Sequence, residues 1–154
     1  MVTLCQRVSL CLCVLVTLGV NSIYALDLDK AKVYFLKGDY KSAITEGEKL
    51  LAVSRESDEL DELYYILALS YLKDGNYLRA WDIFEIILNE LKDSKFKEEA
   101  MLGLGDVYFL KGDFAKARQH YVKLLSDSPD TKLKAQVYYR LAQVGFKTGD
   151  NQAA

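Results

Sequence analysis

Apolar side chains recur every three to four residues along most of this chain, with charged side chains between them. This spacing places one apolar stripe on an α-helix. Glycine and a following polar residue interrupt the stripe at regular places, where one helix is expected to end and the next to begin. The pattern predicts three antiparallel helical hairpins and one further helix. The predicted helices cover residues 27–37 with 40–54, 58–73 with 76–92, 95–110 with 113–125, and 131–147 alone.

The interruptions follow a strict interval of 37 residues. Each is a glycine followed by Asp or Asn, and an alanine lies five positions after each glycine. A fixed interval of this length indicates an array of repeated helical hairpins. The dipeptides are Gly38-Asp39, Gly75-Asn76, Gly112-Asp113 and Gly149-Asp150, and the alanines are Ala43, Ala80, Ala117 and Ala154.

Alignment on the glycines produces columns with distinct mechanical roles. The glycine favours a left-handed turn after the first helix, and Asp39, Asn76 and Asp113 are expected to cap the second helix. A small residue midway along each first helix lets the second helix approach, and a tyrosine three positions later fills the space beside it. The small residues are Ala31, Ala68, Gly105 and Ala142, and the tyrosines are Tyr34, Tyr71 and Tyr108.

These columns resemble the signature of the tetratricopeptide repeat (TPR) family. The third segment carries almost the whole signature, in Met101, Leu104, Gly105, Tyr108, Gly112, Phe114, Ala117, Tyr121, Leu124 and Pro129. The first segment departs from it at Asp27, Lys30 and Gly47 and the fourth at Gly145, as terminal repeats usually do. The resemblance implies an all-α fold, a right-handed superhelix of antiparallel helical hairpins (a TPR α-solenoid). Its repeats would span about 26–57, 58–94, 95–130 and an incomplete 131–154.

The first 25 residues have the pattern of a secretory signal peptide. One basic residue, Arg7, precedes an uncharged run from Val8 to Val20, and the small residue Ala25 precedes an acidic stretch. Cleavage after Ala25 or after Ser22 fits this pattern, and the first choice leaves residues 26–154 as one repeat domain. The run is shorter than the ~20 residues that a membrane-spanning helix needs, and an uncleaved anchor is the alternative.

All three cysteines, Cys5, Cys11 and Cys13, lie within this leader. The exported part would therefore contain no thiol for a disulfide or a zinc site. Leu10 and Leu12, rather than small residues, precede two of the cysteines, which argues against a bacterial lipid anchor.

The repeat interval exceeds the usual ~34 residues by three, and the surplus is expected at residues 132–134, as an added turn at the start of a first helix. Together with the leader, this variant resembles the exported TPR proteins of the Gram-negative envelope. Two types are similar: the lipoprotein subunit of the outer-membrane barrel assembly machine and the periplasmic coordinator of the Tol-Pal system.

Without Arg7 the chain has 19 basic and 22 acidic side chains, and the two signs are interleaved along the sequence. The sequence shows no basic stripe that could follow a phosphate backbone, so nucleic acid is not an expected partner. Contact with a membrane is expected only through an uncleaved leader.

The resemblance also implies that the first helices line the concave side of the superhelix. The 37-residue register then selects two apolar columns with a polar column between them, a groove that suits an extended or helical peptide. For Phe35 and Phe109, packing against neighbouring hairpins is the alternative. The expected groove residues are Leu28, Lys32, Phe35, Tyr65, Leu69, Leu72, Leu102, Asp106, Phe109, Tyr139, Gln143 and Phe146.

One branch of the family, the cytosolic chaperone adaptors, grips a C-terminal carboxylate with lysine, asparagine and arginine at set groove positions. In this chain the corresponding positions hold Leu28, Lys32, Ile66, Glu99 and Gly103. Only Lys32 could serve, so that clamp is not expected.

No catalytic residue, metal site or cofactor is expected. His120 lies mid-helix without a predictable cysteine or serine partner, and Gly103-Leu104-Gly105 lacks the lysine of a phosphate loop. Carboxylates follow Ser57 at the start of a predicted helix, where they complement the helix dipole rather than form a metal site. They are Asp58, Glu59, Asp61 and Glu62.

The last predicted helix has no second helix to pack on, because Ala154 is the alanine that would open one. This helix carries Leu141, Val144 and Phe146. A longer protein is the preferred explanation, and the alternatives are a second subunit that covers the bare face or an end that frays. We predict self-association or low helicity beyond Thr131.

The sequence therefore predicts an exported, non-catalytic scaffold for protein partners in the periplasm or envelope of a Gram-negative-type bacterium. The alternative is a structural spacer or oligomerisation module that positions a further envelope domain.

Overall fold

The computed structural model describes residues 28–53, 60–91 and 93–149. The leader with its cysteines and cleavage sites, and Ser57, Asp58, Glu59 and Ala154, lie outside these ranges. Helices joined by short connections make up the described residues. They are a helical segment at 28–36, α2 (Tyr40–Val53), α3 (Leu60–Asp74), α4 (Tyr77–Asn89), α5 (Lys97–Leu110), α6 (Phe114–Asp127) and α7 (Lys134–Thr148).

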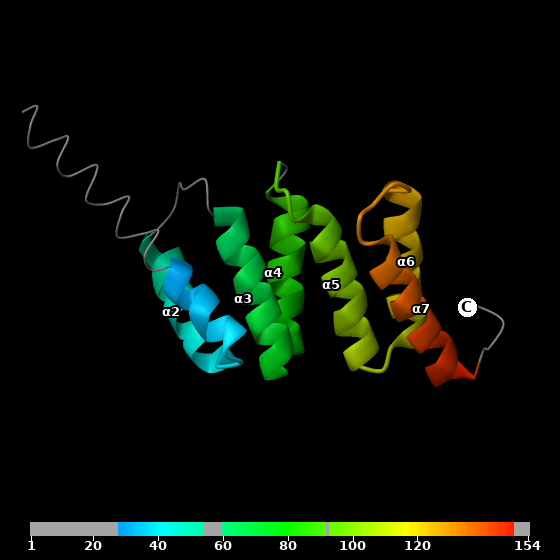
Figure 1. Cartoon of the computed structure of the whole chain (residues 1–154), viewed down its shortest axis with the longest axis horizontal. Helices are drawn as coiled ribbons and strands as arrows, with labels where there is room; N and C mark the ends of the chain where they lie inside the picture. The colour runs from blue at the N-terminus through cyan, green and yellow to red at the C-terminus, as the bar shows by residue number, and fades with distance from the viewer. Residues whose placement is uncertain (1–27, 54–59, 92, 150–154) are drawn as a thin grey trace, which may run out of the picture.

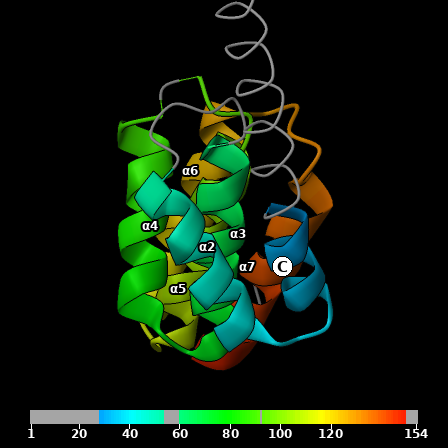
Figure 2. The ribbon, with the colours of Figure 1, turned by 90° about the vertical axis from the view of Figure 1, so that its left-hand side faces the viewer.

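The helices stand in one row of antiparallel hairpins (Figure 1). Each helix contacts its neighbours in sequence, and α3, α5 and α7 also contact one another in order along the row. The turn within each hairpin lies at the lower side of Figure 1, and the described residues of the connections that follow α4 and α6 lie at the upper side. The view along the row in Figure 2 shows the helices one behind another. Contacts confined to near neighbours are the property that defines a solenoid.

A glycine in the left-handed region ends each first helix, as the sequence predicts. The φ angles are 77° at Gly38, 86° at Gly75, 80° at Gly112 and 75° at Gly149. At the third hairpin, Asp113 N donates to the carbonyl of Tyr108 at 2.9 Å and Gly112 N to that of Phe109 at 3.0 Å. These two bonds satisfy carbonyls that the end of α5 would otherwise leave free, as in a Schellman motif.

The residue after each of the first three glycines caps the next helix, which confirms the second prediction for these turns. The side chain of Asn76 accepts from the backbone N–H of Arg79, and that of Asp113 from Lys116, both at 3.2 Å. Asp39 accepts from Ser42 N at the same distance. Each cap satisfies one amide at a helix N-terminus, where no helical carbonyl is in reach.

The predicted boundaries are wrong by a few residues at α4, which ends at Asn89 rather than 92, and at α7, which begins at Lys134 rather than 131. The residues expected to add a turn to the last helix instead form a turn before it. Thr131 is the reason, because its hydroxyl accepts from Leu133 N at 3.1 Å and donates to Glu98 of α5 at 2.6 Å. A contact with the previous hairpin thus replaces the start of the helix.

The core runs along the contact between the two helices of each hairpin. Ala31, Ala68, Ala80 and Ala117 are fully buried, as expected of the small residues that allow close approach. Gly47, which breaks the family signature in the first repeat, is also buried: a Cβ there would lie 2.6 Å from the side chain of Leu67. The missing side chain therefore lets α2 approach α3.

Candidate functional site: a groove across the first helices

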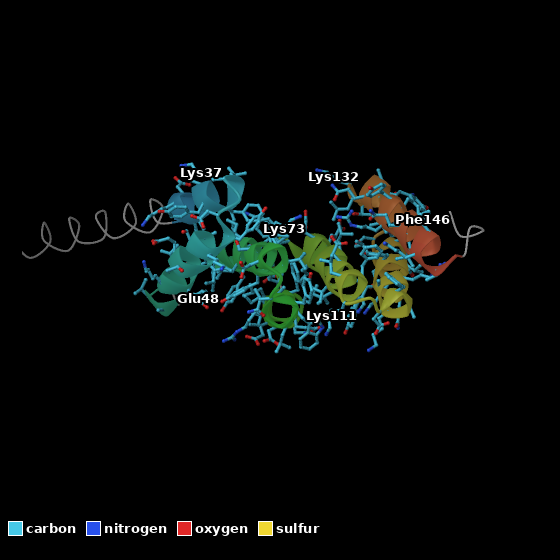
Figure 3. All side chains as sticks on the ribbon, turned by 90° about the horizontal axis from the view of Figure 1, so that it is seen from below. Lys37, Glu48, Lys73, Lys111, Lys132 and Phe146 are labelled. Carbon is cyan, nitrogen blue, oxygen red and sulfur yellow. The ribbon has the colours of Figure 1, made fainter. Side chains whose placement is uncertain are left out.

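A hollow of about 210 Å³ lies across α3, α5 and α7, which contribute one wall each. Its lining consists of Leu72, Lys73, Asp106, Phe109, Leu110, Arg140 and Gln143. The structure thus brings together Leu72, Asp106, Phe109 and Gln143 from the predicted groove. Figure 3 shows Lys73 on the same side of the row as Lys37 and Phe146, whereas Glu48 of α2 lies on the other side.

Sequence reasoning missed three residues of this lining: Lys73, Leu110 and Arg140. A signal for the first two was present, because they occupy one repeat column directly after the column of Leu72 and Phe109. Arg140 has no such signal, since its repeat equivalents are Ile66 and Gly103. Only the facing position of Asp106 on α5 explains why a cation lies there.

Asp106 is the centre of a polar network on the groove floor. Its Oδ1 accepts from the Tyr121 hydroxyl at 2.7 Å and from Arg140 Nε at 2.7 Å, and its Oδ2 accepts from Arg140 Nη2 at 3.1 Å. The paired, two-point geometry fixes the guanidinium of α7 against α5. Both carboxylate oxygens are therefore already engaged within the protein.

The network continues along α7. Arg140 Nη1 donates to Gln143 Oε1 at 3.3 Å, and Gln143 Nε2 donates to the Tyr139 hydroxyl at 3.3 Å. The guanidinium carbon also lies 5.7 Å from the centre of the Tyr139 ring. Gln143 thus accepts from Arg140 through its amide oxygen and donates to the exposed Tyr139 through its amide nitrogen.

Ionisation in the groove is set by burial and by Asp106. The hydrogen bonds that Arg140 donates to Asp106 raise the pKa of Arg140, so the guanidinium stays charged. Burial, and then the charge of Asp106, raises the pKa of Tyr121, so its phenol remains a donor. Burial, followed by the charges of Glu99 and Asp106, likewise raises the pKa of Tyr65.

The polar groups that remain for a ligand are donors. Lys73 forms no ion pair with any residue of the described part of the chain, and Arg140 keeps N–H groups beyond those that Asp106 and Gln143 accept. Asp106, the one carboxylate of the lining, has both oxygens engaged. The lining consequently has a net positive charge, and its free polar groups are mainly donors.

The apolar wall is only partly accessible. Phe109 is half-buried, and its ring packs edge-on against Phe114 at 5.4 Å between centroids. Phe35 is half-buried in the same way against Tyr40, at 5.7 Å. Both phenylalanines therefore pack against the helix that follows them. Phe109 also lines the hollow, where Leu110 is 49% exposed.

Three leucines predicted for the groove face are buried instead. Leu28 is 3%, Leu72 7% and Leu102 8% exposed, and each belongs to the hydrophobic core. Leu72 borders the hollow from below, whereas Leu28 and Leu102 are taken up by packing between adjacent helices. Leu69 is also half-buried against the core. Four of the twelve predicted groove residues line the hollow, and the 37-residue register did not predict how deeply each column is buried.

The other predicted groove residues lie on either side of the hollow. Tyr65 stacks on Phe96 with centroids 4.6 Å apart, and Lys32 pairs with Glu62 at 2.8 Å. Lys32, the single cation at a carboxylate-clamp position, is therefore already engaged. Tyr139 and Phe146 are the accessible aromatic side chains, at 60% and 80% exposure.

The histidine and the carboxylates that could have carried chemistry are held in packing contacts and hydrogen bonds within the protein. His120 stacks on Tyr108 with centroids 5.1 Å apart, and burial lowers the pKa of its imidazole. Asp61 and Glu62 lie in the first turn of α3, where Asp61 accepts from the hydroxyl of Ser94 and from Lys95 N, both at 3.3 Å. Among the described residues, no cluster of His, Cys, Asp or Glu is arranged to hold a metal ion.

Comparison with known proteins identifies the fold. Residues 99–131 match the family profile described as tetratricopeptide repeat. A crystal structure of a tetratricopeptide repeat protein from Parabacteroides merdae superposes with a TM-score of 0.68 at 23% sequence identity, over 84% of this chain and 47% of that one. No curated protein sequence matches the chain. The fold is therefore an all-α TPR solenoid, as the sequence predicts, and the chain spans about half the length of that structure.

No helix within residues 28–53, 60–91 and 93–149 combines the length and the apolar character needed to cross a bilayer.

Proposed function

We propose that this chain is an exported, non-catalytic scaffold that holds a peptide segment of a partner protein in the groove across α3, α5 and α7. The observation that carries the proposal is the lining of the hollow, where an apolar wall meets hydrogen-bond donors that the protein itself does not use. TPR solenoids offer such curved surfaces for binding proteins. Their function lies in holding a partner rather than in chemistry on a substrate.

The lining indicates the chemistry of the segment. Lys73 and Arg140 need acceptors, while Phe109 and Leu110 offer an apolar contact beside them. A complementary segment has a carboxylate flanked by an apolar side chain. The charge-assisted bonds supply direction, and burial of the apolar side chain contributes ~1.5 to 3 kcal/mol.

The proposed setting is the bacterial envelope, where the scaffold would recruit partners for envelope or outer-membrane assembly. The leader of residues 1–25 and the confinement of all three cysteines to that leader support export. The resemblance to exported TPR proteins of the Gram-negative envelope supports the role in assembly.

A peptide array tests the groove. The array contains 12-residue peptides with one Asp or Glu beside an apolar residue, each with a twin in which the acid is the corresponding amide. Full-length protein should prefer the acidic member of each pair by about tenfold, the effect of one charge-assisted bond. Lys73→Met should abolish that preference, whereas Lys123→Met, the same change on the exposed side of α6, should leave it intact.

Tyr139→Ala should weaken binding of both twins, because the exposed ring is lost without a change in the core. Circular dichroism establishes that each variant is folded. If neither Tyr139→Ala nor Lys73→Met alters binding, the peptide lies elsewhere and the groove is not the site. Capture of a partner from envelope extract that these two variants lose would connect the array result to the envelope.

A second function, that of spacer or oligomerisation module, is favoured by the surface of α7. Leu67 and Leu104 are 1% exposed in α3 and α5, whereas their equivalent Leu141 is only half-buried. Tyr138 beside it is 55% exposed. The face that second helices cover in the earlier hairpins is therefore accessible on α7, and the predicted self-association would use it.

A further inference from the structure

The turns within the hairpins gather on one edge of the molecule, at the lower side of Figure 1 and facing the viewer in Figure 3. We call this surface the turn edge. It consists of residues 35–42, 72–79, 109–116 and 146–149. The first three segments are octets that follow the 37-residue interval, so they repeat the same position in three hairpins.

The turn edge is basic although the whole chain is slightly acidic. Each octet has two cations and one carboxylate, and the fourth segment adds Lys147, which makes seven cations against three carboxylates. The opposite edge, formed by residues 60–62, 90–99 and 127–134, has eight carboxylates and four cations among its described residues. The antiparallel hairpins thus separate charges that are interleaved along the sequence.

Most cations of the turn edge form no ion pair within the described part of the chain. Lys116 pairs with Asp113 at 3.3 Å. The other six form no ion pair with any residue of the described ranges. They are Lys37, Lys41, Lys73, Arg79, Lys111 and Lys147.

Helix stability accounts for four of these cations but not for the other three. The four lie at or directly after the C-terminal ends of helices, where the dipole favours positive charge, and they are Lys37, Lys73, Lys111 and Lys147. Lys41, Arg79 and Lys116 lie in the first turns of α2, α4 and α6, where the helix dipole disfavours positive charge and favours carboxylates. Those first turns contain no acidic residue, whereas α3 and α5 begin with acidic pairs at the opposite edge. The arrangement therefore lowers helix stability slightly and points to a partner outside the molecule.

Apolar side chains project from the same edge. Leu36 is 81%, Leu78 67% and Leu110 49% exposed, and Phe146 at the end of α7 is 80% exposed. They come from the ends or starts of four different helices, so they are spread along the row and not gathered in one pocket. Large exposed apolar side chains among unpaired cations are the combination that binds at the headgroup boundary of a bilayer.

We infer that the turn edge binds the surface of an anionic phospholipid bilayer. The cations outside the groove lie against the lipid phosphates, and Leu36, Leu78 and Phe146 enter the headgroup layer. This contact is distinct from any anchor at the N-terminus and leaves the hollow between α3, α5 and α7 beside the membrane. Each cation near an anionic surface raises the partition coefficient several-fold, so a multivalent edge suffices for reversible binding.

Vesicle partitioning of the full-length protein tests the inference. The measured quantity is the ratio of the partition coefficients on vesicles with about 30 mol % phosphatidylglycerol and on pure phosphatidylcholine. Any contribution of the leader is the same in all variants. The test variant is Lys41→Glu with Arg79→Glu and Lys111→Glu, which leaves Lys73 of the groove untouched. The control, Lys95→Glu with Lys132→Glu and Lys134→Glu, makes the same change of net charge on the opposite edge.

The wild-type ratio should be well above one and should fall as salt is added. The turn-edge variant should lower it by at least about tenfold, and the control by less than about threefold. Equal losses in both variants would mean that only net charge matters, which overturns the inference. No lipid preference in the wild type, together with binding to polyglutamate resin through the same three cations, would make the edge a protein site.

Insertion is tested with a tryptophan reporter. Trp81 is the single tryptophan, so a Trp81→Phe background leaves the introduced ring as the only emitter. Lipids brominated along the acyl chain should quench Leu78→Trp but not Val122→Trp, whose position on α6 is also exposed, at 51% against 67% for Leu78. Equal quenching, or none at either position, would contradict the proposed orientation. Peptide binding in the groove is unaffected by either result, so the two proposals fail separately.

Discussion

At the scale of single residues, two aromatic rings pack directly on glycines of α5, and one of them connects the core to the groove. A Cβ on Gly105 would lie 2.2 Å from the Tyr121 ring, and one on Gly103 would lie 2.3 Å from the Phe84 ring. Both contacts are shorter than real Cβ contacts allow. The Tyr121 hydroxyl donates to Asp106. Gly105, which leaves room for the Tyr121 ring, therefore also helps to position the Asp106 carboxylate in the groove.

Gly105→Ala should therefore destabilise the protein by about 1 to 3 kcal/mol through overpacking, and should weaken acidic peptides in the groove. Helix propensity alone predicts the reverse, since alanine is favoured over glycine by about 1 kcal/mol. Urea denaturation distinguishes the two. Ala68 is the equivalent residue of α3, and Ala68→Gly serves as a control that should destabilise by ordinary propensity. A gain in stability for Gly105→Ala would show that the ring moves freely.

Tyr71 gives a pH-dependent contribution to stability. Burial, and then the hydrogen bond that its hydroxyl donates to Glu48, raises its pKa to about 12 from the ordinary 10.0. The folded state therefore holds this proton more tightly than the unfolded state. The contribution is complete below pH ~10 and is lost as the pH rises toward ~12.

Tyr71→Phe should cost about 0.5 to 1.5 kcal/mol at pH 8, where the hydrogen bond is intact. The difference in the free energy of unfolding between wild type and variant should shrink between pH 10 and 11.5. Urea denaturation at a series of pH values measures it, and subtraction removes the other tyrosines. A constant difference over that range would show that Tyr71 titrates normally.

At the scale of elements, the connections that follow α4 and α6 contain the same arrangement of hydrogen bonds. A hydroxyl in the connection donates to a carboxylate in the first turns of the preceding first helix and accepts from an amide two residues on. Thr131 does so with Glu98 and Leu133, and Ser94 with Asp61 and Phe96. The Thr131–Glu98 bond is shorter, at 2.6 Å against 3.3 Å, and holds α7 to α5.

Thr131→Val should remove this link while preserving the shape of a side chain that is only 7% exposed. The loss of one buried hydrogen bond and the unpaired groups left behind predict a cost of about 1 to 3 kcal/mol. Amide exchange in α7 should accelerate more than in α3. Thr45→Val is the control, since the Thr45 hydroxyl bonds only within α2, to the carbonyl of Lys41. If amide exchange in α7 is unchanged, apolar packing alone keeps α7 ordered and the Thr131–Glu98 hydrogen bond does not contribute.

Local chemistry explains which elements could be predicted. The glycine turns and Asx caps depend on a few adjacent residues, so the hairpin turns were predicted correctly. The start of α7 depends on Glu98, 33 residues from Thr131, and no local pattern reports that contact. The groove shows the same division. Periodicity identified the face of Asp106 and Gln143, whereas Arg140 and the burial of Leu102 follow from the meeting of separate helices.

At the scale of the whole molecule, the distribution of charge over the folded surface differs from the order of charges along the sequence. The sequence showed only interleaved signs, and the stacking of hairpins turns them into a basic and an acidic edge. This separation could have been found by counting charges in register with the 37-residue interval. The exposure of Tyr138 on α7 also depends on the arrangement of the repeats, because each helix of a solenoid is buried only by the helices next to it.

The surface of α7 predicts self-association. Val144, expected on the bare face, is fully buried, so Tyr138 is the residue to change. Sedimentation velocity should show a coefficient that rises with concentration for the wild type and stays constant for Tyr138→Lys. Val122→Lys, at a similarly exposed position on α6, should behave as the wild type. A wild-type coefficient independent of concentration would remove the oligomerisation role. The described α7 is helical through Thr148, in contrast to the expected loss of helicity.

The glycine turns also bear on chemical synthesis of the protein. Nothing lies within 4 Å of the position that a Cβ would take at Gly75 or Gly112, so only the positive φ restricts those sites. A residue of inverted handedness prefers that very region of backbone space. D-Alanine at either site would match the positive φ of the backbone and would restrict the conformations of the unfolded chain, so it should raise the free energy of unfolding.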